Sequence, residues 1–170
     1  MSGYVIRRAV PADFPILQQI EISAGEPFRA TQLAWVADDP PPSLDALQAH
    51  LDHGGLWVIT LNDRPVGYLA GETHGELAVI HQVSVHLDHH RQGLGAQLIE
   101  AAVEGARKAG ATTMGLTTYR DTPWNGPYYA RLGFTEVTGS DVPPALQAMR
   151  DQEAAAGHDP ALRSVMIRPL

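Results

Sequence analysis

The spacing of hydrophobic residues changes several times along the chain, and these changes predict alternating strands and helices. Residues 77–85 alternate with a period of two, so the odd-numbered positions share one face of a strand, with His81 set among apolar side chains. Residues 95–109 carry apolar side chains at a helical period, and Gly110 follows where that helix would end. A central strand is therefore expected to lead into the strongest helix of the chain.

The other segments continue this alternation. Helical spacing after Pro11 predicts a first helix, and Ser43 is a candidate N-cap for a second. The triplet Asn62-Asp63-Arg64 is typical of a hairpin turn between two strands. Further strands are expected at residues 4–8, 56–61, 65–71, 112–119, 134–137 and 162–167, and further helices at 127–132 and 145–156. The expected fold class is α/β, a mixed sheet of about seven strands flanked by helices.

Length and composition favour a single soluble domain. The chain has 170 residues, of which 44% are hydrophobic and 18% charged, so one domain over residues 1–170 is expected. No apolar run approaches the roughly 20 residues that span a bilayer. Arg7 and Arg8 interrupt the N-terminal stretch, where a secretory signal needs an apolar core. We expect a cytoplasmic protein without a membrane partner.

Charge and cysteine content exclude several classes of chemistry. The formal net charge is −7, whereas nucleic-acid binding requires a basic surface, so no nucleic-acid partner is expected. An acidic protein suits a cationic substrate. The absence of cysteine excludes disulfides, thiolate metal sites and a cysteine nucleophile. His86, His89 and His90 are close in sequence but lack carboxylates in a defined ligand geometry, so no metal is expected.

A candidate anion site lies where the central strand turns into the strong helix, and we call residues 90–95 the glycine turn. The first N–H groups of a helix have no partner within it, and residues 92–95 include no Ser, Thr, Asp or Asn to cap them. Gly93 and Gly95 allow phosphate oxygens to approach the backbone, and Arg91 adds positive charge. The alternative is a glycine turn that binds nothing.

Two common phosphate motifs do not fit this turn. Leu98 stands where the dinucleotide fingerprint requires Gly or Ala, and no Lys-Ser or Lys-Thr pair follows as in a P-loop. Residues 85–95 instead resemble the acyl-CoA pyrophosphate loop of the GNAT N-acetyltransferase superfamily, which reads Gln/Arg-x-x-Gly-x-Gly/Ala. The first position departs from that pattern because it is His90. Either His90 or Arg91 is therefore expected to contact the pyrophosphate.

A second segment supports the same resemblance. Residues 125–134, which read Asn-Gly-Pro-Tyr-Tyr-Ala-Arg-Leu-Gly-Phe, resemble the aromatic-Tyr-x-x-Leu-Gly-Phe segment of that family. The order of strands and helices also matches the family's fold over essentially the whole chain. The resemblance implies a mostly antiparallel sheet that is splayed between its fourth and fifth strands.

The resemblance implies acetyl-CoA as the cosubstrate. In this family the pantetheine arm lies in the splay like an extra strand, so the backbones of Val83 and Val85 are expected to pair with it. Asn125 and Tyr129 are expected to contact the cofactor as well, although Asn125 has the alternative role of capping the helix at 127–132. The residues of the turn and helix start expected to bind it are His90, Arg91, Gln92, Gly93, Leu94, Gly95 and Ala96.

Catalytic roles follow from the same resemblance. His81 is the candidate base for the amine, because a reference pKa of about 6.5 suits neutral pH, and the alternative is a buried neutral histidine. The N–H of Val83 is implied as the oxyanion donor. Tyr129 is implied as the acid that protonates the CoA thiolate; its alternative is a packing aromatic, and Tyr128 is expected in the core. With no cysteine and no Gly-x-Ser-x-Gly, direct attack in a ternary complex is favoured.

The acceptor is not readable from the sequence. Glu21, Glu26, Phe28 and Trp35 lie in the region that borders the acceptor pocket in this family, and their alternative is a solvated helix face. The chain is thus predicted to be an acetyl-CoA-dependent N-acetyltransferase for a small-molecule or protein amine. A non-catalytic acyl-CoA-binding sensor or regulatory module is the alternative. The family resemblance also allows a homodimer.

Overall fold

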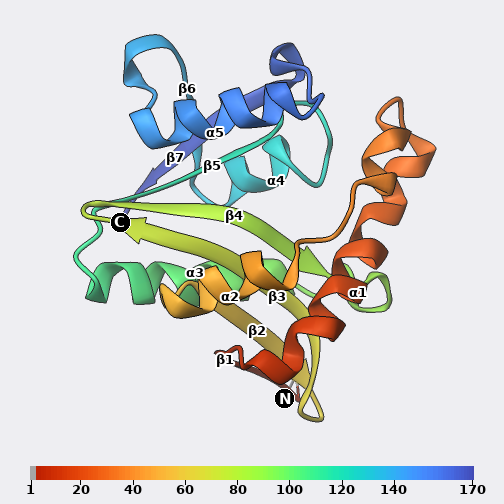
Figure 1. Cartoon of the computed structure of the whole chain (residues 1–170). Coiled ribbons are helices and arrows are strands. Elements are labelled where there is room, and N and C mark those ends of the chain that lie inside the picture. The colour runs from red at the N-terminus through yellow and green to blue at the C-terminus, as the bar shows by residue number, and fades with distance from the viewer. Residues whose placement is uncertain (1–2) are drawn as a thin grey trace. The chain divides into compact units, whose positions relative to one another are not determined.

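The computed structural model describes residues 3–170, in which helices and strands alternate along the chain (Figure 1). The strands are β1 (Tyr4–Arg8), β2 (Leu56–Leu61), β3 (Arg64–His74), β4 (Leu77–Val85), β5 (Thr113–Tyr119), β6 (Thr135–Val137) and β7 (Arg163–Pro169). The α-helices are α1 (Phe14–Gly25), α2 (Leu44–Asp52), α3 (Leu94–Lys108), α4 (Gly126–Arg131) and α5 (Pro144–Ala155).

The strands form one mixed sheet in the order β1-β2-β3-β4-β5-β7-β6. The pairs β1–β2, β2–β3, β5–β7 and β6–β7 are antiparallel, whereas β4 and β5 are parallel. The β4–β5 register runs only from Leu77 opposite Thr113 to Val79 opposite Gly115, although both strands continue beyond it. The predicted fold class, a mixed and mostly antiparallel sheet of about seven strands flanked by helices, is confirmed.

The chain divides into two compact units. The first unit comprises the chain up to Glu72 together with Gln82–Gly105, and the second comprises Thr73–His81 together with Ala106–Leu170. The single domain expected from the sequence stays a prediction. Each unit is described by itself below.

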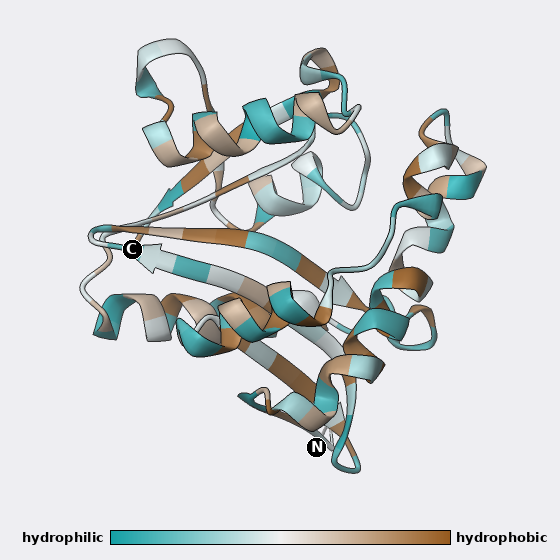
Figure 2. Ribbon diagram, viewed as in Figure 1, coloured by the Kyte–Doolittle hydropathy of each residue, from teal (hydrophilic) through white to brown (hydrophobic). Residues whose placement is uncertain are grey.

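In the first unit, α1 and α2 pack on one face of β2 and β3. Leu17, Leu47 and Tyr68 are fully buried there. Figure 2 shows hydrophobic and hydrophilic residues alternating along α1 and α2, as expected for helices with one buried face. On the other face, α3 approaches β2 so closely that a Cβ added to Gly105 would lie 3.0 Å from the Trp57 ring. These contacts hold the strands between helices on both faces.

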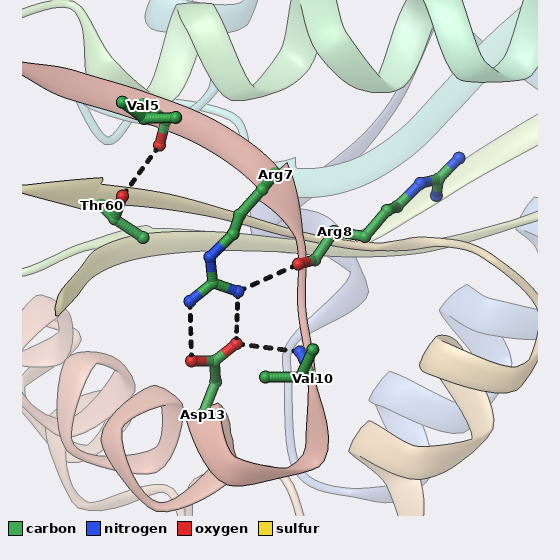
Figure 3. A network of polar contacts seen from close by, with 6 residues as sticks. All are labelled: Val5, Arg7, Arg8, Val10, Asp13 and Thr60. Atoms are coloured by element: carbon green, nitrogen blue, oxygen red, sulfur yellow. Dashed lines mark hydrogen bonds and ion pairs between the residues drawn. The ribbon is translucent and has the colours of Figure 1, made fainter. Parts of the chain in front are cut away.

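A buried carboxylate joins β1 to the start of α1 (Figure 3). Asp13 accepts two hydrogen bonds from the Arg7 guanidinium, at 2.8 and 3.1 Å, and one from the Val10 N–H at 2.9 Å. Burial by itself would raise the pKa of Asp13, but the hydrogen bonds and the charge of Arg7 outweigh it, so that pKa lies below its ordinary value. The network fixes how the chain leaves the edge strand.

In the second unit, α5 packs on β5 and β7. Leu146 of α5 is fully buried beside Val79 and Val165. A Cβ on Gly115 of β5 would lie 2.5 Å from Leu146 Cδ1, so the glycine lets this side chain of α5 pack closely on the strand. A partly buried ion pair between Arg163 of β7 and Glu153 of α5, 2.9 Å, also joins this helix to the sheet.

After α1 the chain forms two 3₁₀ helices, η2 (Glu26–Ala30) and η3 (Ala34–Asp38). One expectation about local structure is wrong. In β4, Ala78, Val79 and Ile80 are buried in succession while His81 is exposed, so the predicted alternation of faces fails. Both faces of this internal strand are covered at its start, and side chains then stay apolar at every position.

Candidate functional site

The glycine turn, residues 90–95, follows the short 3₁₀ helix η4 (Leu87–His89) after β4 and includes the first two residues of α3. Arg91 and Gly93 have left-handed backbone conformations, with φ of 60° and 72°. A Cβ added to Gly93 would have no neighbouring atom within 4 Å, so the space beside this backbone is open. Only glycine adopts this conformation readily and leaves the backbone bare.

The start of α3 fits an anion such as a diphosphate. The first helical hydrogen bond runs from the Gln97 N–H to the Gly93 carbonyl at 3.2 Å, so the N–H groups of Leu94, Gly95 and Ala96 have no acceptor within the helix. The Leu94 side chain is 2% exposed and anchors the turn in the core. These N–H groups and the positive end of a 15-residue helix are the chemistry that binds phosphate oxygens.

Side-chain hydrogen bonds within the first unit fasten the turn. His90 donates from Nε2 to the Val85 carbonyl at 2.7 Å, and the Tyr4 hydroxyl donates to Gln92 Oε1 at 2.9 Å. The Leu87 N–H donates to Ser23 Oγ of α1 at 3.0 Å. Of the two residues expected at the pyrophosphate, His90 thus uses Nε2 to brace the strand end, whereas Arg91 is exposed.

Beside β4 in the first unit lies a group that we call the carboxylate network: Glu21, Tyr68, Gln82 and Ser84. Glu21 Oε2 accepts hydrogen bonds from the Tyr68 hydroxyl at 2.8 Å and from Ser84 Oγ at 2.5 Å. Glu21 Oε1 accepts one from Gln82 Nε2 at 2.7 Å. Burial raises the pKa of Glu21, and the three hydrogen bonds only partly offset it. Burial and the neighbouring Glu21 charge also raise the pKa of Tyr68.

The solvated helix face considered for Glu21 is therefore wrong. Glu21 lies four residues after Leu17 and one after Ile20, both of which are buried, so it belongs to the inward stripe of α1. That spacing was the available signal in the sequence, because an acidic residue on an apolar stripe needs buried polar partners. The sequence carries no signal for the three partners of Glu21, because they lie far from it along the chain. Tyr68, Gln82 and Ser84 are 47, 61 and 63 residues after Glu21.

In the second unit, Tyr129 and Asn125 lie on and before the short helix α4. The Tyr129 side chain packs edge-on against Tyr128 and Phe134, at ring distances of 5.4 and 5.8 Å. Tyr129 is 9% exposed and Tyr128 is more exposed, so the expectation that Tyr128 is the core residue of the pair is wrong. The Asn125 side chain makes no capping hydrogen bond, so the capping alternative is wrong as well.

The remaining predicted residues divide between the units. Val83, Val85, the glycine turn and the four acceptor candidates belong to the first unit, whereas His81 belongs to the second. His81 is exposed, which contradicts the alternative of a buried neutral histidine. Glu26 forms an exposed ion pair with Arg29 at 3.0 Å. Trp35 is 40% exposed and Phe28 is partly buried.

The part of the chain that the structure describes brings no three His, Cys, Asp or Glu residues together at a metal-binding distance. None of its helices has the length and apolar character needed to cross a membrane.

Comparisons with known proteins agree on one family. Residues 20–134 match the model of the Acetyltransferase (GNAT) family. The uncharacterized N-acetyltransferase MJ1207 of Methanocaldococcus jannaschii is 33% identical over 92 residues, which cover 50% of this chain and 41% of that protein. The chain thus spans less than half the length of this curated relative.

Solved structures share the fold at low identity. PaiA N-acetyltransferase of Thermoplasma acidophilum, solved in complex with coenzyme A, matches 100% of both chains with a TM-score of 0.74 and 13% identity. The ribosomal-protein-S18-alanine N-acetyltransferase of Escherichia coli matches 98% of this chain and 93% of its own, with a TM-score of 0.68 and 20% identity.

Proposed function

Because this chain belongs to the GNAT acetyltransferase family, we propose that it transfers an acetyl group from acetyl-CoA to a primary amine. The observation that carries the proposal is the glycine turn, whose open, left-handed Gly93 precedes the bare N–H groups of α3. This cradle suits the diphosphate of coenzyme A. When bound, acetyl-CoA supplies a thioester carbonyl that an amine can attack.

The residues of the first unit have defined parts in this proposal. The N–H groups of Leu94, Gly95 and Ala96 hold phosphate oxygens, and Arg91 adds a positive charge. Gln92 and His90 keep the turn in place through the hydrogen bonds described above. Backbone groups of Val83 and Val85 pair with pantetheine, and the Val83 N–H donates to the oxyanion of the tetrahedral intermediate. Preorganised donors of this kind need no rearrangement during the reaction.

The acid in this proposal is Tyr129, as the family resemblance implies. Tyr129 donates a proton to the departing thiolate, and Asn125, whose side chain does not cap α4, bonds the cofactor. A Tyr129→Phe variant is therefore expected to lose kcat more than affinity for acetyl-CoA. The sequence predicts His81 as the base, a prediction still to be tested, and the structure shows its side chain exposed.

The acceptor amine approaches as a cation, since an alkyl amine with a pKa of about 10.4 is protonated at neutral pH. The net charge of −7 suits such a substrate. The proposal includes both small-molecule and protein amines as acceptors. The name of the Escherichia coli enzyme described above gives an alanine of ribosomal protein S18 as its acceptor. A cytoplasmic location, a homodimer and the absence of a metal stay predictions.

The decisive experiment measures thiol release from acetyl-CoA with polyamines, amino acids, aminoglycosides, arylalkyl amines and peptides. The chain has no cysteine and so contributes no thiol background. Amine-dependent release supports the enzyme and identifies its acceptor class. If no amine supports release although acetyl-CoA still raises the Tm, the non-catalytic acyl-CoA sensor is favoured. If acetyl-CoA does not raise the Tm either, the cofactor assignment fails.

The order of steps is tested with the best acceptor. Direct attack in a ternary complex requires both substrates to be bound together, so double-reciprocal plots at several acceptor concentrations are expected to intersect. Parallel lines would indicate an acyl-enzyme intermediate and contradict direct attack.

A further inference from the structure

The Glu21 carboxylate differs from an ordinary surface glutamate because β3 and β4 hold it from both sides. Tyr68 donates from β3, and Gln82 and Ser84 donate from β4. Gln82 also donates to Ser84 Oγ at 3.1 Å, which links the two β4 side chains. All three donors are neutral groups. The carboxylate is therefore fixed in position without being neutralised by them.

One oxygen of this carboxylate can still accept a hydrogen bond from a ligand. Oε2 accepts two hydrogen bonds, whereas Oε1 accepts one from Gln82, and a carboxylate oxygen has two lone pairs. Glu21 is only partly buried, so the free lone pair is not sealed in the core. The network thus offers a positioned acceptor for one more N–H donor.

The carboxylate network lies beside the part of β4 that is proposed to hold the reacting thioester. Gln82 and Ser84 flank Val83, and side chains two residues apart lie on the same face of a strand. Glu21 therefore lies against the face of β4 that carries Gln82 and Ser84. These two residues flank Val83, whose N–H is the proposed oxyanion donor. A carboxylate here meets the two needs of acetyl transfer to a cationic amine, attraction of the cation and removal of its proton.

We propose that Glu21 accepts the proton of the acceptor amine, and that Tyr68, Gln82 and Ser84 are positioning residues for it. This role rests on the proposed function. The ammonium gives one proton to Glu21, and its freed lone pair forms the C–N bond to the thioester carbon. As the C–S bond breaks, the nitrogen loses its second proton and the thiolate gains one. The products are the amide and free CoA, with one net proton released to solvent.

The titratable groups that act on Glu21 are Tyr68, through its hydrogen bond, and Asp39, whose negative charge adds to the effect of burial. Both burial and Asp39 raise the pKa of Glu21 above its ordinary value of 4.5. Glu21 works as a base only when ionised. Activity is therefore expected to fall as the pH drops through this raised pKa.

The test is the pH dependence of kcat/KM with the best acceptor amine. In the wild type, kcat/KM is expected to form a plateau between the pKa of Glu21 and that of the amine. Glu21→Gln is expected to lower kcat/KM about 100- to 10,000-fold at neutral pH. Its plateau is expected to disappear, because the variant must use the free amine, whose fraction rises about tenfold per pH unit below the amine pKa.

Three further variants separate this role from the alternatives. Glu104→Gln, an exposed carboxylate of α3, is the matched control and is expected to keep the wild-type profile. Tyr68→Phe keeps the carboxylate but removes one donor to its ionised form, so the acidic limb is expected to move to higher pH. His81→Gln is expected to keep the acidic limb. Each variant must retain the acetyl-CoA-induced rise in Tm, which reports folding and cofactor binding.

Several results would overturn the proposal. If Glu21→Gln keeps the plateau and only raises KM, Glu21 binds the amine and does not take its proton. If His81→Gln removes the limb while Glu21→Gln keeps it, the base is His81. An acidic limb that does not move in Tyr68→Phe contradicts the positioning role. A wild type without amine-dependent thiol release overturns the proposed function itself, a failure distinct from the others.

Discussion

Replacing Gly93 by alanine tests whether the glycine turn binds coenzyme A. Gly93 has φ of 72°, where a residue with a Cβ pays about 1–2 kcal/mol in conformational strain. For a chain of this size each kcal/mol corresponds to about 2–4 °C in Tm, so Gly93→Ala is expected to lower the Tm by about 2–8 °C. This loss by itself says nothing of binding, so it requires a control with the same strain.

Gly75 provides that control. It lies in the turn between β3 and β4 with φ of 59°, and a Cβ there, as at Gly93, meets no atom within 4 Å. Gly75→Ala and Gly93→Ala are therefore expected to lose similar stability. Only at Gly93 would the new methyl group enter the space beside the N–H groups of α3 that we propose for phosphate oxygens.

The expected binding effect follows from the hydrogen bonds that the methyl group displaces. Losing one charge-assisted bond to a phosphate oxygen costs about 1.5–3 kcal/mol, equivalent to a Kd about 10- to 150-fold weaker. Isothermal titration calorimetry with coenzyme A measures the Kd of the wild type and both variants. Equal Kd values for coenzyme A in Gly93→Ala and Gly75→Ala would contradict phosphate binding at the glycine turn.

Three further predictions concern stability and catalysis. Asp13→Asn is expected to lower the free energy of unfolding by about 1–2 kcal/mol at pH 7, a modest loss because Arg7 is partly exposed. Because the folded-state pKa of Asp13 is lowered, its ionised form stabilises the fold above the unfolded-state pKa, and this stabilisation is lost as the pH falls through the folded-state pKa. In urea unfolding, the stability difference between the wild type and Asp13→Asn should therefore be smaller at pH 3 than at pH 7. Gly55→Ala would place a Cβ 2.1 Å from the Gly71 carbonyl oxygen, a backbone atom that cannot move away. The free energy of unfolding is therefore expected to fall by about 3 kcal/mol or more. As a control, Gly25→Ala, whose Cβ would lie 3.6 Å from its nearest atom, should unfold near the wild-type urea midpoint. Tyr129→Phe should lower kcat while the Kd for acetyl-CoA stays within a few-fold, and unchanged turnover would remove Tyr129 from the acid role.

Local signals in the sequence predicted most elements of the fold. Ser43 accepts the Ala46 N–H at 3.1 Å as the expected N-cap of α2. Asn62 and Asp63 both have positive φ, as a tight hairpin turn between β2 and β3 requires. Both signals act within a few residues, so reading the chain locally was enough.

The glycine turn was predictable for the same reason. Its proposed chemistry depends on a bare backbone at the start of one helix, and Gly93 and Gly95, which provide it, are two positions apart in sequence. The brace from His90 to Val85 spans five residues, yet it was not expected, because a histidine in this position can point either to a ligand or back to its own strand.

Tertiary structure decided the facing of residues along β4 and the surroundings of Glu21. Covered on both faces at its start, β4 loses the alternation that a half-exposed strand would show. The environment of Glu21 comes from Tyr68, Gln82 and Ser84, which are distant in sequence and meet it only when α1 packs on β3 and β4. Backbone conformation is set by neighbours along the chain, whereas burial and side-chain partners are set by neighbours in space, and this difference separates the residues that the sequence revealed from those that it did not.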